Sequence, residues 1–250
     1  MNSHATGRGS GQPTPAQLKE LFAQIESGRV NKGRLQEFLR GSTQAVTLEV
    51  AREIVGKKNF FGPKEWTKFF GKKFQLANIP EIPRSKNELE NPEINQEHFL
   101  FLRPDRLDGK PLNLQAWHEI YPGGKHPKFY LGQYLSHKFA QGVCEPRWHL
   151  MPVGIVKGST GLIYDRQVAM QCFIDEYEVP TTSARVTANI LYYLLNKKYL
   201  DTDYWARTCD LSDSGNPVIV QGDSDDGLVV RHWYDDAYDR IGVSASRNLL

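Results

Sequence analysis

Hydrophobic residues recur at helical spacing in the first part of the chain. A first helix is expected to begin at Pro15, with Thr14 as its N-cap, and to end at Gly28. Its apolar stripe consists of Leu18, Leu21, Phe22 and Ile25. Shorter helices are predicted over residues 30–41 and 48–56.

The second part of the chain alternates short apolar runs with loops. Runs at 99–103, 150–156 and 218–222 predict strands, and a longer helix is expected over 183–200, capped by Thr182 or Ser183. The buried face of that helix is expected to contain Val186, Ile190, Tyr193 and Leu194. One strong helix among short strands and long loops indicates the α+β class.

Changes in composition divide the chain into four segments. Residues 1–14 are rich in Gly, Ser and Pro, which is typical of a disordered tail. Residues 15–75 are expected to form a small helical N-terminal unit. Residues 76–97 are rich in Pro, Asn and Glu and are expected to be a connector. Residues 98–250 are expected to be the main α+β domain.

Charge separates the last fifty residues from the rest. Residues 201–250 contain ten Asp and four Arg with neither Lys nor Glu, so their local charge is −6, although the whole chain carries +2. The first 200 residues hold 16 Lys and 15 Glu, and the same frequency would place about eight of them in the last fifty. The two parts of the chain therefore differ in their net charge and in the types of charged residue that they contain.

A basic and aromatic stretch spans residues 57–74. Its lysines are Lys57, Lys58, Lys64, Lys68, Lys72 and Lys73. Its aromatic residues are Phe60, Phe61, Trp66, Phe69, Phe70 and Phe74. Such a stretch could bind nucleic acid through phosphate contacts and base stacking. The simpler interpretation is an amphipathic helix with its aromatic rings in the core, because Trp66, Phe69 and Phe70 have helical spacing.

Cysteine and histidine give no strong sign of catalysis or metal binding. Cys144, Cys172 and Cys209 lie far apart without C-x-x-C spacing, so mostly buried, reduced thiols are expected. His118, His126 and His137 lack the spacing that places two metal ligands on one face. Cys144 and His149 could form a nucleophile and base, but closeness in sequence does not establish that geometry.

The most informative segment lies between the apolar runs that end at Val230 and begin at Ile241. Its candidate binding residues are Arg231, His232, Tyr234, Asp235, Asp236, Tyr238 and Arg240. Tyr and Arg are common at binding hot spots, and Tyr with small polar groups is typical of antibody loops. An ordinary polar hairpin is the alternative, but such a surface normally contains Lys and Glu. The expected buried scaffold consists of Trp205, Trp233, Ile241 and Val243.

A mutational mechanism would account for the missing Lys and Glu. Randomising the adenines of Asn codons that end in a pyrimidine produces Tyr, Asp, Arg and His codons among others. It cannot produce Lys, Glu, Gln, Met, Trp or stop codons. Every residue from Arg231 to Arg240 except Trp233 belongs to the permitted set.

The order of short motifs in this region resembles a known family. The motifs are Pro180–Thr181 before the long helix, WART (205–208), DSDDGLVV (223–230), WYDD (233–236) and IGVSASR (241–247). The segment is similar to the variable protein of a diversity-generating retroelement. The C-terminus of such a protein is a C-type-lectin-like domain related to formylglycine-generating enzymes. The similarity covers roughly residues 145–250, with a variable region at about 205–247.

The resemblance implies a non-enzymatic, receptor-like protein that binds a macromolecule, in particular a protein. The enzyme branch needs a pair of cysteines near the C-terminus, and this segment has only Cys209, so oxidase chemistry is not expected. Asp223, Asp225 and Asp226 are the local candidates for calcium, but turn capping is the simpler role, and neither metal nor cofactor is expected. A nucleic-acid-associated protein is the alternative function, with a degenerate enzyme as a third.

The length of the apolar runs and the composition of the N-terminus bear on the expected cellular location. No run approaches the length needed to cross a bilayer, and the N-terminus lacks the apolar core of a secretory signal. A cytoplasmic protein is therefore expected, and the sequence leaves export by another route open.

Overall fold

The computed structural model describes residues 15–28, 46–223 and 227–247. The chain divides into two units, residues 1–44 and residues 45–249, which are considered separately. The helices after residue 45 are α3 (Leu48–Val55), α4 (Pro63–Phe70), α5 (Lys86–Leu89), α6 (Pro92–Asn95), α7 (Leu114–Ile120), α8 (Lys138–Gln141), α9 (Tyr164–Val168), α10 (Gln171–Asp175) and α11 (Thr182–Asn196), with 3-10 turns at Gly71–Lys73 and Gly132–Ser136. The strands are β1 (Phe60–Phe61), β2 (His98–Arg103), β3 (Arg106–Leu107), β4 (Lys110–Pro111), β5 (Phe129–Tyr130), β6 (Arg147–Pro152), β7 (Tyr177–Glu178), β8 (Trp205–Leu211), β9 (Pro217–Asp223), β10 (Gly227–His232), β11 (Ile241–Val243) and β12 (Ser246–Arg247).

The first unit contributes one described helix, α1 (Pro15–Glu26), which matches the helix expected from the sequence. Pro15 opens the helix, where a missing N–H is tolerated. None of its residues is buried, and Phe22 in the apolar stripe is exposed. The tail at 1–14 and the helix expected over 30–41 lie outside the described residues.

The second unit begins with helices that the sequence assigned to a separate N-terminal region. Trp66 of α4 is fully buried, and its indole Nε1 donates to the Leu102 carbonyl of β2 at 2.8 Å. Strand β1 pairs in parallel with β2, with Phe60 opposite Leu100. The expected boundary after residue 75 is therefore wrong, because these aromatic rings supply part of the one core of the second unit.

Residues 76–97 are not a connector either. Leu89 of α5 and Ile94 of α6 are buried in the same core. The indole of Trp148 donates to the Pro80 carbonyl at 2.8 Å, and Arg84 donates to the Arg247 carbonyl at 2.9 Å. A segment rich in Pro and Asn thus packs through a few anchored residues, although its composition alone predicts an exposed linker.

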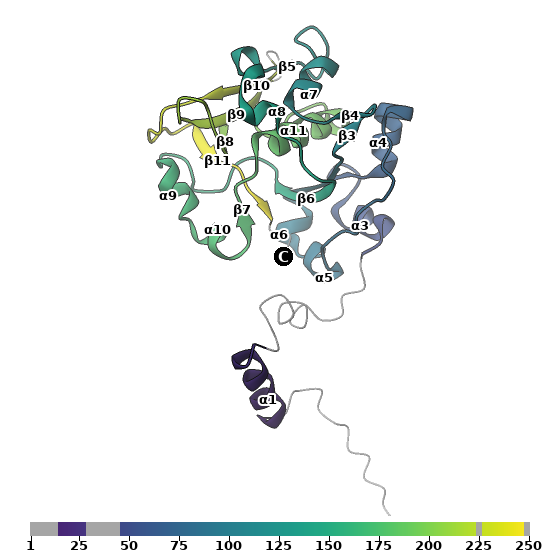
Figure 1. Cartoon of the computed structure of the whole chain (residues 1–250), viewed down its shortest axis with the longest axis vertical. Coiled ribbons are helices and arrows are strands. Elements are labelled where there is room, and N and C mark those ends of the chain that lie inside the picture. The colour runs from purple at the N-terminus through teal and green to yellow at the C-terminus, as the bar shows by residue number, and fades with distance from the viewer. Residues whose placement is uncertain (1–14, 29–45, 224–226, 248–250) are drawn as a thin grey trace, which may run out of the picture. The chain divides into compact units, whose positions relative to one another are not determined.

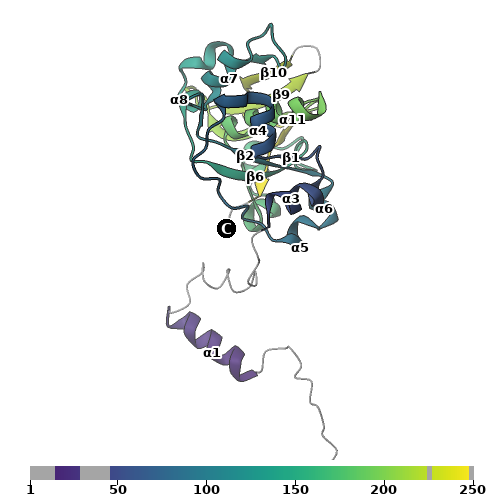
Figure 2. The same ribbon diagram turned by 90° about the vertical axis from the view of Figure 1, so that its right-hand side faces the viewer.

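The second unit has the α+β architecture that the sequence predicted. A three-stranded sheet has the order β1-β2-β6, and a five-stranded sheet has the order β11-β8-β9-β10-β5. Figure 1 shows α11 at the centre of this unit, where it contacts β2 of the first sheet and β8, β9 and β10 of the second. Figure 2 shows α4 in front of this arrangement. Two small pairs, β7 with β12 and β3 with β4, complete the strands.

Helix α11 joins the two sheets because it is buried along its first three turns. Thr181, and not Thr182 or Ser183 as expected from the sequence, caps its N-terminus by accepting a hydrogen bond from the Ala184 backbone at 3.2 Å. Its residues from Thr182 to Tyr192 are all buried, including Arg185 and Asn189. A helix that is buried on every side lies in the core, so its polar residues need internal partners.

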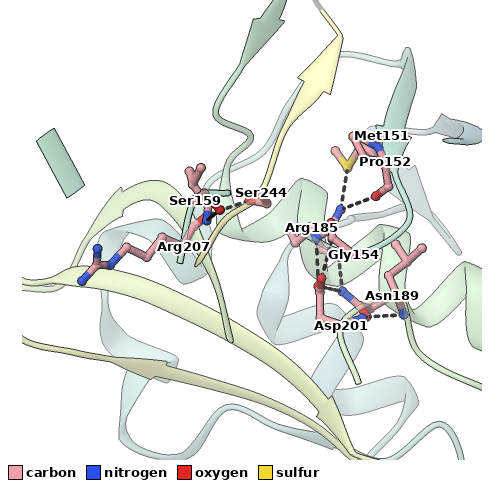
Figure 3. A network of polar contacts seen from close by, with 11 residues as sticks. Met151, Pro152, Gly154, Ser159, Arg185, Asn189, Asp201, Arg207 and Ser244 are labelled. Atoms are coloured by element: carbon pink, nitrogen blue, oxygen red, sulfur yellow. Dashed lines mark hydrogen bonds and ion pairs between the residues drawn. The ribbon is translucent and has the colours of Figure 1, made fainter. Parts of the chain in front are cut away.

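Those partners form a buried polar network (Figure 3). The Arg185 guanidinium pairs with both carboxylate oxygens of Asp201, and Asn189 Nδ2 donates to the same carboxylate at 2.9 Å. Arg185 also donates to the carbonyls of Pro152 and Gly154. The network fixes α11 against β6 and against the chain that leads into β8.

No helix among the described residues is both long enough and apolar enough to cross a membrane.

Candidate ligand-binding surface

The residues singled out by the sequence lie at one end of the five-stranded sheet. We call residues 231–240 the display loop; it begins in the last two residues of β10 and ends where β11 starts. Nine of these ten side chains are exposed, with Tyr234 at 69%, and only His232 is partly buried. The segment therefore presents a continuous stretch of side chains to solvent.

Arg207 of β8 anchors the backbone of the display loop, and its side chain is fully buried. Its Nη2 donates to the Asp236 carbonyl at 2.7 Å. Its Nη1 donates to the Leu162 carbonyl at 2.9 Å and to Gln167 Oε1 at 3.0 Å. Because the acceptor on the loop is a backbone carbonyl, this bond does not depend on the side chain at position 236.

Burial also shifts the pKa of this anchor. Burial lowers the pKa of Arg207, while Asp235 and Asp236 raise it by their negative charge. An arginine nevertheless stays protonated in proteins, so the anchor donates charge-assisted hydrogen bonds. Gln167, which is also buried, extends the anchor by donating to the Ser159 carbonyl at 2.7 Å.

Further backbone contacts fix both ends of the display loop. The Trp233 N–H donates to the Pro217 carbonyl at 3.1 Å, and the Trp205 N–H donates to the Arg240 carbonyl at 2.9 Å. The Gly161 N–H donates to the Tyr238 carbonyl at 3.2 Å. These bonds use main-chain atoms of the loop, so they are compatible with different side chains at the same positions.

Two of the predicted binding residues also support the loop. Asp235 Oδ1 accepts from the Tyr164 backbone at 2.7 Å and lies 3.7 Å from Arg207 Nη2. His232 Nδ1 is 3.0 Å from the Tyr134 hydroxyl. Asp235 and His232 thus have structural partners, whereas the Tyr234 side chain has none among the described residues.

Aromatic and cationic side chains pack on one another along the outer face. The rings of Trp233 and Tyr238 lie 5.7 Å apart between centroids. The guanidinium carbon of Arg231 lies 5.6 Å from the centroid of the Trp205 ring. Such pairs form an amphipathic surface of the kind enriched in protein interfaces.

The structure corrects one part of the predicted scaffold. Ile241 and Val243 are buried, and Trp205 is half-buried. Trp233 is 39% exposed, so the expectation that it is a buried scaffold residue is wrong. In β10 the residues Leu228 and Val230 face the core, and position 233 continues the opposite, outward phase of this alternation.

The other candidate sites are not assembled. Within the described ranges, no group of three His, Cys, Asp or Glu side chains could hold a metal ion, and His118, His126 and His137 contact a carbonyl, a tyrosine and an aspartate, respectively. Asp225 and Asp226, proposed as calcium candidates with Asp223, lie outside the described residues.

The cysteines are free thiols, but they are less buried than the sequence indicated. Cys144 and Cys172 are half-buried and Cys209 is exposed. Loss of solvation raises the pKa of each thiol, that of Cys209 to about 11. A thiol with a raised pKa is a poor nucleophile near neutral pH, which disfavours the pairing of Cys144 with His149 as nucleophile and base.

The basic and aromatic stretch at 57–74 places most of its aromatic rings in the core and its lysines in solvent, as the simpler interpretation predicted. Phe60, Phe61, Trp66 and Phe70 are buried, so these rings are not accessible for stacking on bases. All six lysines are exposed. Lys64 pairs with Glu49 at 3.0 Å, and Lys73 lies 3.7 Å from Asp108, which reduces the local positive charge.

No protein-family model matches the chain, and no curated protein or solved structure matches it.

Proposed function

We propose that this chain is a non-enzymatic binding protein with a C-type-lectin-like fold, and that adenine-directed retroelement mutagenesis diversifies its display loop. The observation that carries the proposal is the way the loop is held. Arg207, Gly161 and Trp205 bind its main-chain atoms, while nine of its ten side chains are exposed. A surface built in this way tolerates changes of side chain without losing its backbone conformation.

The composition supports the same function. The last fifty residues lack Lys and Glu altogether, whereas the loop is rich in Tyr, Asp and Arg. Selection for an acidic surface would accept Glu as readily as Asp. Codons that end in a pyrimidine exclude Glu and Lys together, which links the composition to a mutational cause.

The ligand is a macromolecule in this proposal, in particular a protein. The loop combines Tyr and Trp rings with Arg and Asp side chains, which is the composition of protein-binding hot spots and antibody loops. The lysines of the 57–74 stretch could contact phosphate, but their buried aromatic neighbours supply no stacking platform.

The decisive experiment reads the DNA around the gene. We expect a near-copy of the coding sequence for roughly residues 205–247, differing almost only where the copy has adenine, beside a reverse transcriptase gene. At positions 231, 232, 234, 235, 236, 238 and 240 the copy is expected to read mostly Asn codons. A neighbourhood with neither an adenine-biased repeat nor a reverse transcriptase gene would refute the diversification mechanism.

A protein-level test compares displayed and supporting residues. Tyr234→Ala should change the free energy of unfolding by no more than about 0.5 kcal/mol, as for ordinary surface sites. Ile241→Ala should cost about 2–5 kcal/mol, because it leaves a cavity in the core. Denaturant unfolding measures both, and equal destabilisation by the two substitutions would contradict the assignment.

A further inference from the structure

A second candidate site lies in a cavity of about 520 Å³ that involves none of the display-loop residues. We call it the arginine pocket. Its polar lining includes Arg103 at the end of β2, Arg147 and His149 of β6, Ser183 in the first turn of α11 and Asp210 of β8. Phe139 and Val143 contribute apolar surface to the same cavity.

Arg103 is the unusual member of this pocket. Its side chain is almost completely buried, with 3% of the residue exposed. Its Nη2 donates to the Ser183 hydroxyl at 2.7 Å, and its Nε has no hydrogen-bond partner. In the part of the chain that the structure describes, no carboxylate lies within ion-pair distance of Arg103, whereas the buried Arg185 has Asp201. A buried cation without a counter-ion is costly.

Two more buried nitrogen atoms of the pocket lack partners. They are Nε of Arg147 and Nε2 of His149. The outer nitrogen of Arg147 is occupied by Glu178, and His149 Nδ1 lies 3.3 Å from the Ser246 hydroxyl. Burial, reinforced by the charges of Arg147 and Arg103, lowers the pKa of His149 well below its ordinary value, so the imidazole is neutral near pH 7. The Nε atoms of Arg103 and Arg147 are donors without acceptors, and Nε2 of His149 is a third donor only in the tautomer that carries its proton there, so these lining residues can donate to an acceptor in the cavity.

The charges around the pocket leave one positive charge in excess. The lining cations are Arg103, Arg147 and the exposed Lys138. The lining acids are Glu178, which pairs with Arg147, and Asp210, whose Oδ2 accepts from the Thr182 backbone at 2.6 Å. Glu178 is therefore already paired, whereas Asp210 keeps its negative charge and raises the pKa of Arg103 from beyond ion-pair distance. Of the two lining cations without an ion pair among the described residues, Arg103 and Lys138, only Arg103 is buried.

We propose that the arginine pocket binds a small organic carboxylate, with its oxyanion on the Arg103 guanidinium and its apolar part against Phe139 and Val143. A single negative charge matches the single excess cation. A planar carboxylate also fits the fork of guanidinium donors. A doubly charged phosphate is disfavoured because Asp210 already occupies the first-turn N–H of α11 and adds its own negative charge.

The first test measures binding to the full chain by calorimetry and by thermal denaturation. The probes are sodium benzoate, neutral benzamide and sodium phosphate, all at constant ionic strength. We expect benzoate to bind saturably and to raise the Tm, and benzamide and phosphate to have no such effect. An absent benzoate response, an equal response to benzamide, or an equal response to phosphate would each overturn the carboxylate assignment.

Variants localise the response. Arg103→Met should weaken benzoate binding by about tenfold or more, as expected for loss of a hydrogen-bonded charge. Its Tm without ligand should not fall, because the substitution removes an uncompensated buried cation. Arg166→Met, at an exposed position of α9, is the matched control and should bind benzoate as the unmodified chain does.

A second variant tests the same cavity at an exposed lining position, without altering a buried residue. Val143 is 53% exposed in the lining of the pocket, so Val143→Trp should fill part of the cavity without removing a charge. It should weaken benzoate binding while the folded state is retained. Unchanged benzoate affinity in both Arg103→Met and Val143→Trp would place the binding elsewhere and contradict the proposal.

Discussion

Four arginines are buried in the described part of the chain; Arg84 pairs with Glu88, and the other three, Arg103, Arg185 and Arg207, are each compensated differently. Arg185 faces the carboxylate of Asp201, whereas Arg207 donates to two carbonyls and an amide oxygen. Arg103 has one hydroxyl, from Ser183. These differences indicate three roles: Arg185 joins elements in the core, Arg207 holds the display loop, and Arg103 marks a pocket.

The Arg185–Asp201 pair leads to a stability prediction. Asp201→Asn should cost about 3–5 kcal/mol, because it preserves the shape but leaves a buried arginine without a counter-charge. Urea unfolding with circular dichroism measures the change. Asp203→Asn, at an exposed position two residues away, is the control and should have little effect. Equal unfolding midpoints for the two variants would contradict the role given to the pair.

A buried histidine makes stability depend on pH. Burial lowers the pKa of His98 to about 4, and the nearby charges of Arg247 and Arg84 act in the same direction. Between this value and the ordinary value of 6.5, the unfolded state binds more protons than the folded state. Stability should therefore rise with pH through this window, by about 3 kcal/mol at most.

Unfolding measured at several values between pH 4 and pH 7 tests this linkage. His98→Gln should flatten the pH dependence of the unfolding free energy, and His126→Gln, at an exposed position, should not. His149 is expected to leave a remaining slope, because burial lowers its pKa as well. An unchanged slope in His98→Gln would show that its protonation is not coupled to folding.

At the level of elements, the short strand β11 closes the display loop by packing closely on an earlier segment. Ile241 and Val243 are buried, and the Val243 N–H donates to the Ser159 hydroxyl at 3.0 Å. A Cβ placed on Gly242 would lie 2.3 Å from Cδ1 of Ile155 and 2.7 Å from the hydroxyl of Ser159. The close approach of the two segments therefore requires glycine at position 242.

Gly242→Ala should destabilise the protein by about 1–3 kcal/mol, because the added methyl group overpacks a buried contact. Hydrogen exchange of the display loop should also become faster, since its anchor is displaced. Gly124→Ala is the matched control, because a Cβ there meets nothing within 4 Å. If the two alanine variants have the same Tm, β11 is not the close-packed anchor described here.

At the scale of the whole molecule, the second unit (residues 45–249) has one core. That core combines Trp66 of α4, Leu89 of α5, Trp117 of α7 and Ile190 of α11. The sequence had divided these residues among a helical unit, a connector and a main domain. Burial of aromatic rings from all three segments makes them a single body.

Truncated chains distinguish a boundary near residue 45 from the boundary before residue 98 that the composition predicted. A chain that begins at residue 45 should keep the cooperative unfolding and the Tm of the second unit, because no residue of its core is removed. A chain that begins at residue 98 should not fold cooperatively, since it loses Phe61, Trp66 and Leu89 from the core. Differential scanning calorimetry measures both, and cooperative folding of the shorter chain would restore the boundary expected from composition.

Local physics determined much of what the sequence predicted correctly. Pro15 at a first helical position and helical apolar spacing identified α1, α3 and α11, although the N-cap of α11 is Thr181 and not the expected Thr182 or Ser183. Alternating or continuous apolar runs identified β2 and β9, whereas the run at 150–156 overlaps only the end of β6. Exposure of the display loop followed from its polar and aromatic composition. These features depend on neighbours within a few residues.

Tertiary structure decided the rest, because the deciding contacts join residues far apart in the chain. Arg103 meets Ser183, Arg207 meets Asp236, and Trp66 donates to Leu102. The outward face of Trp233 depends on the phase of β10 in its sheet, and Gln167 gives no local signal of its role as an anchor. Composition determined that the last fifty residues differ from the rest, whereas packing determined which side chains are presented and which nitrogen atoms are left without acceptors.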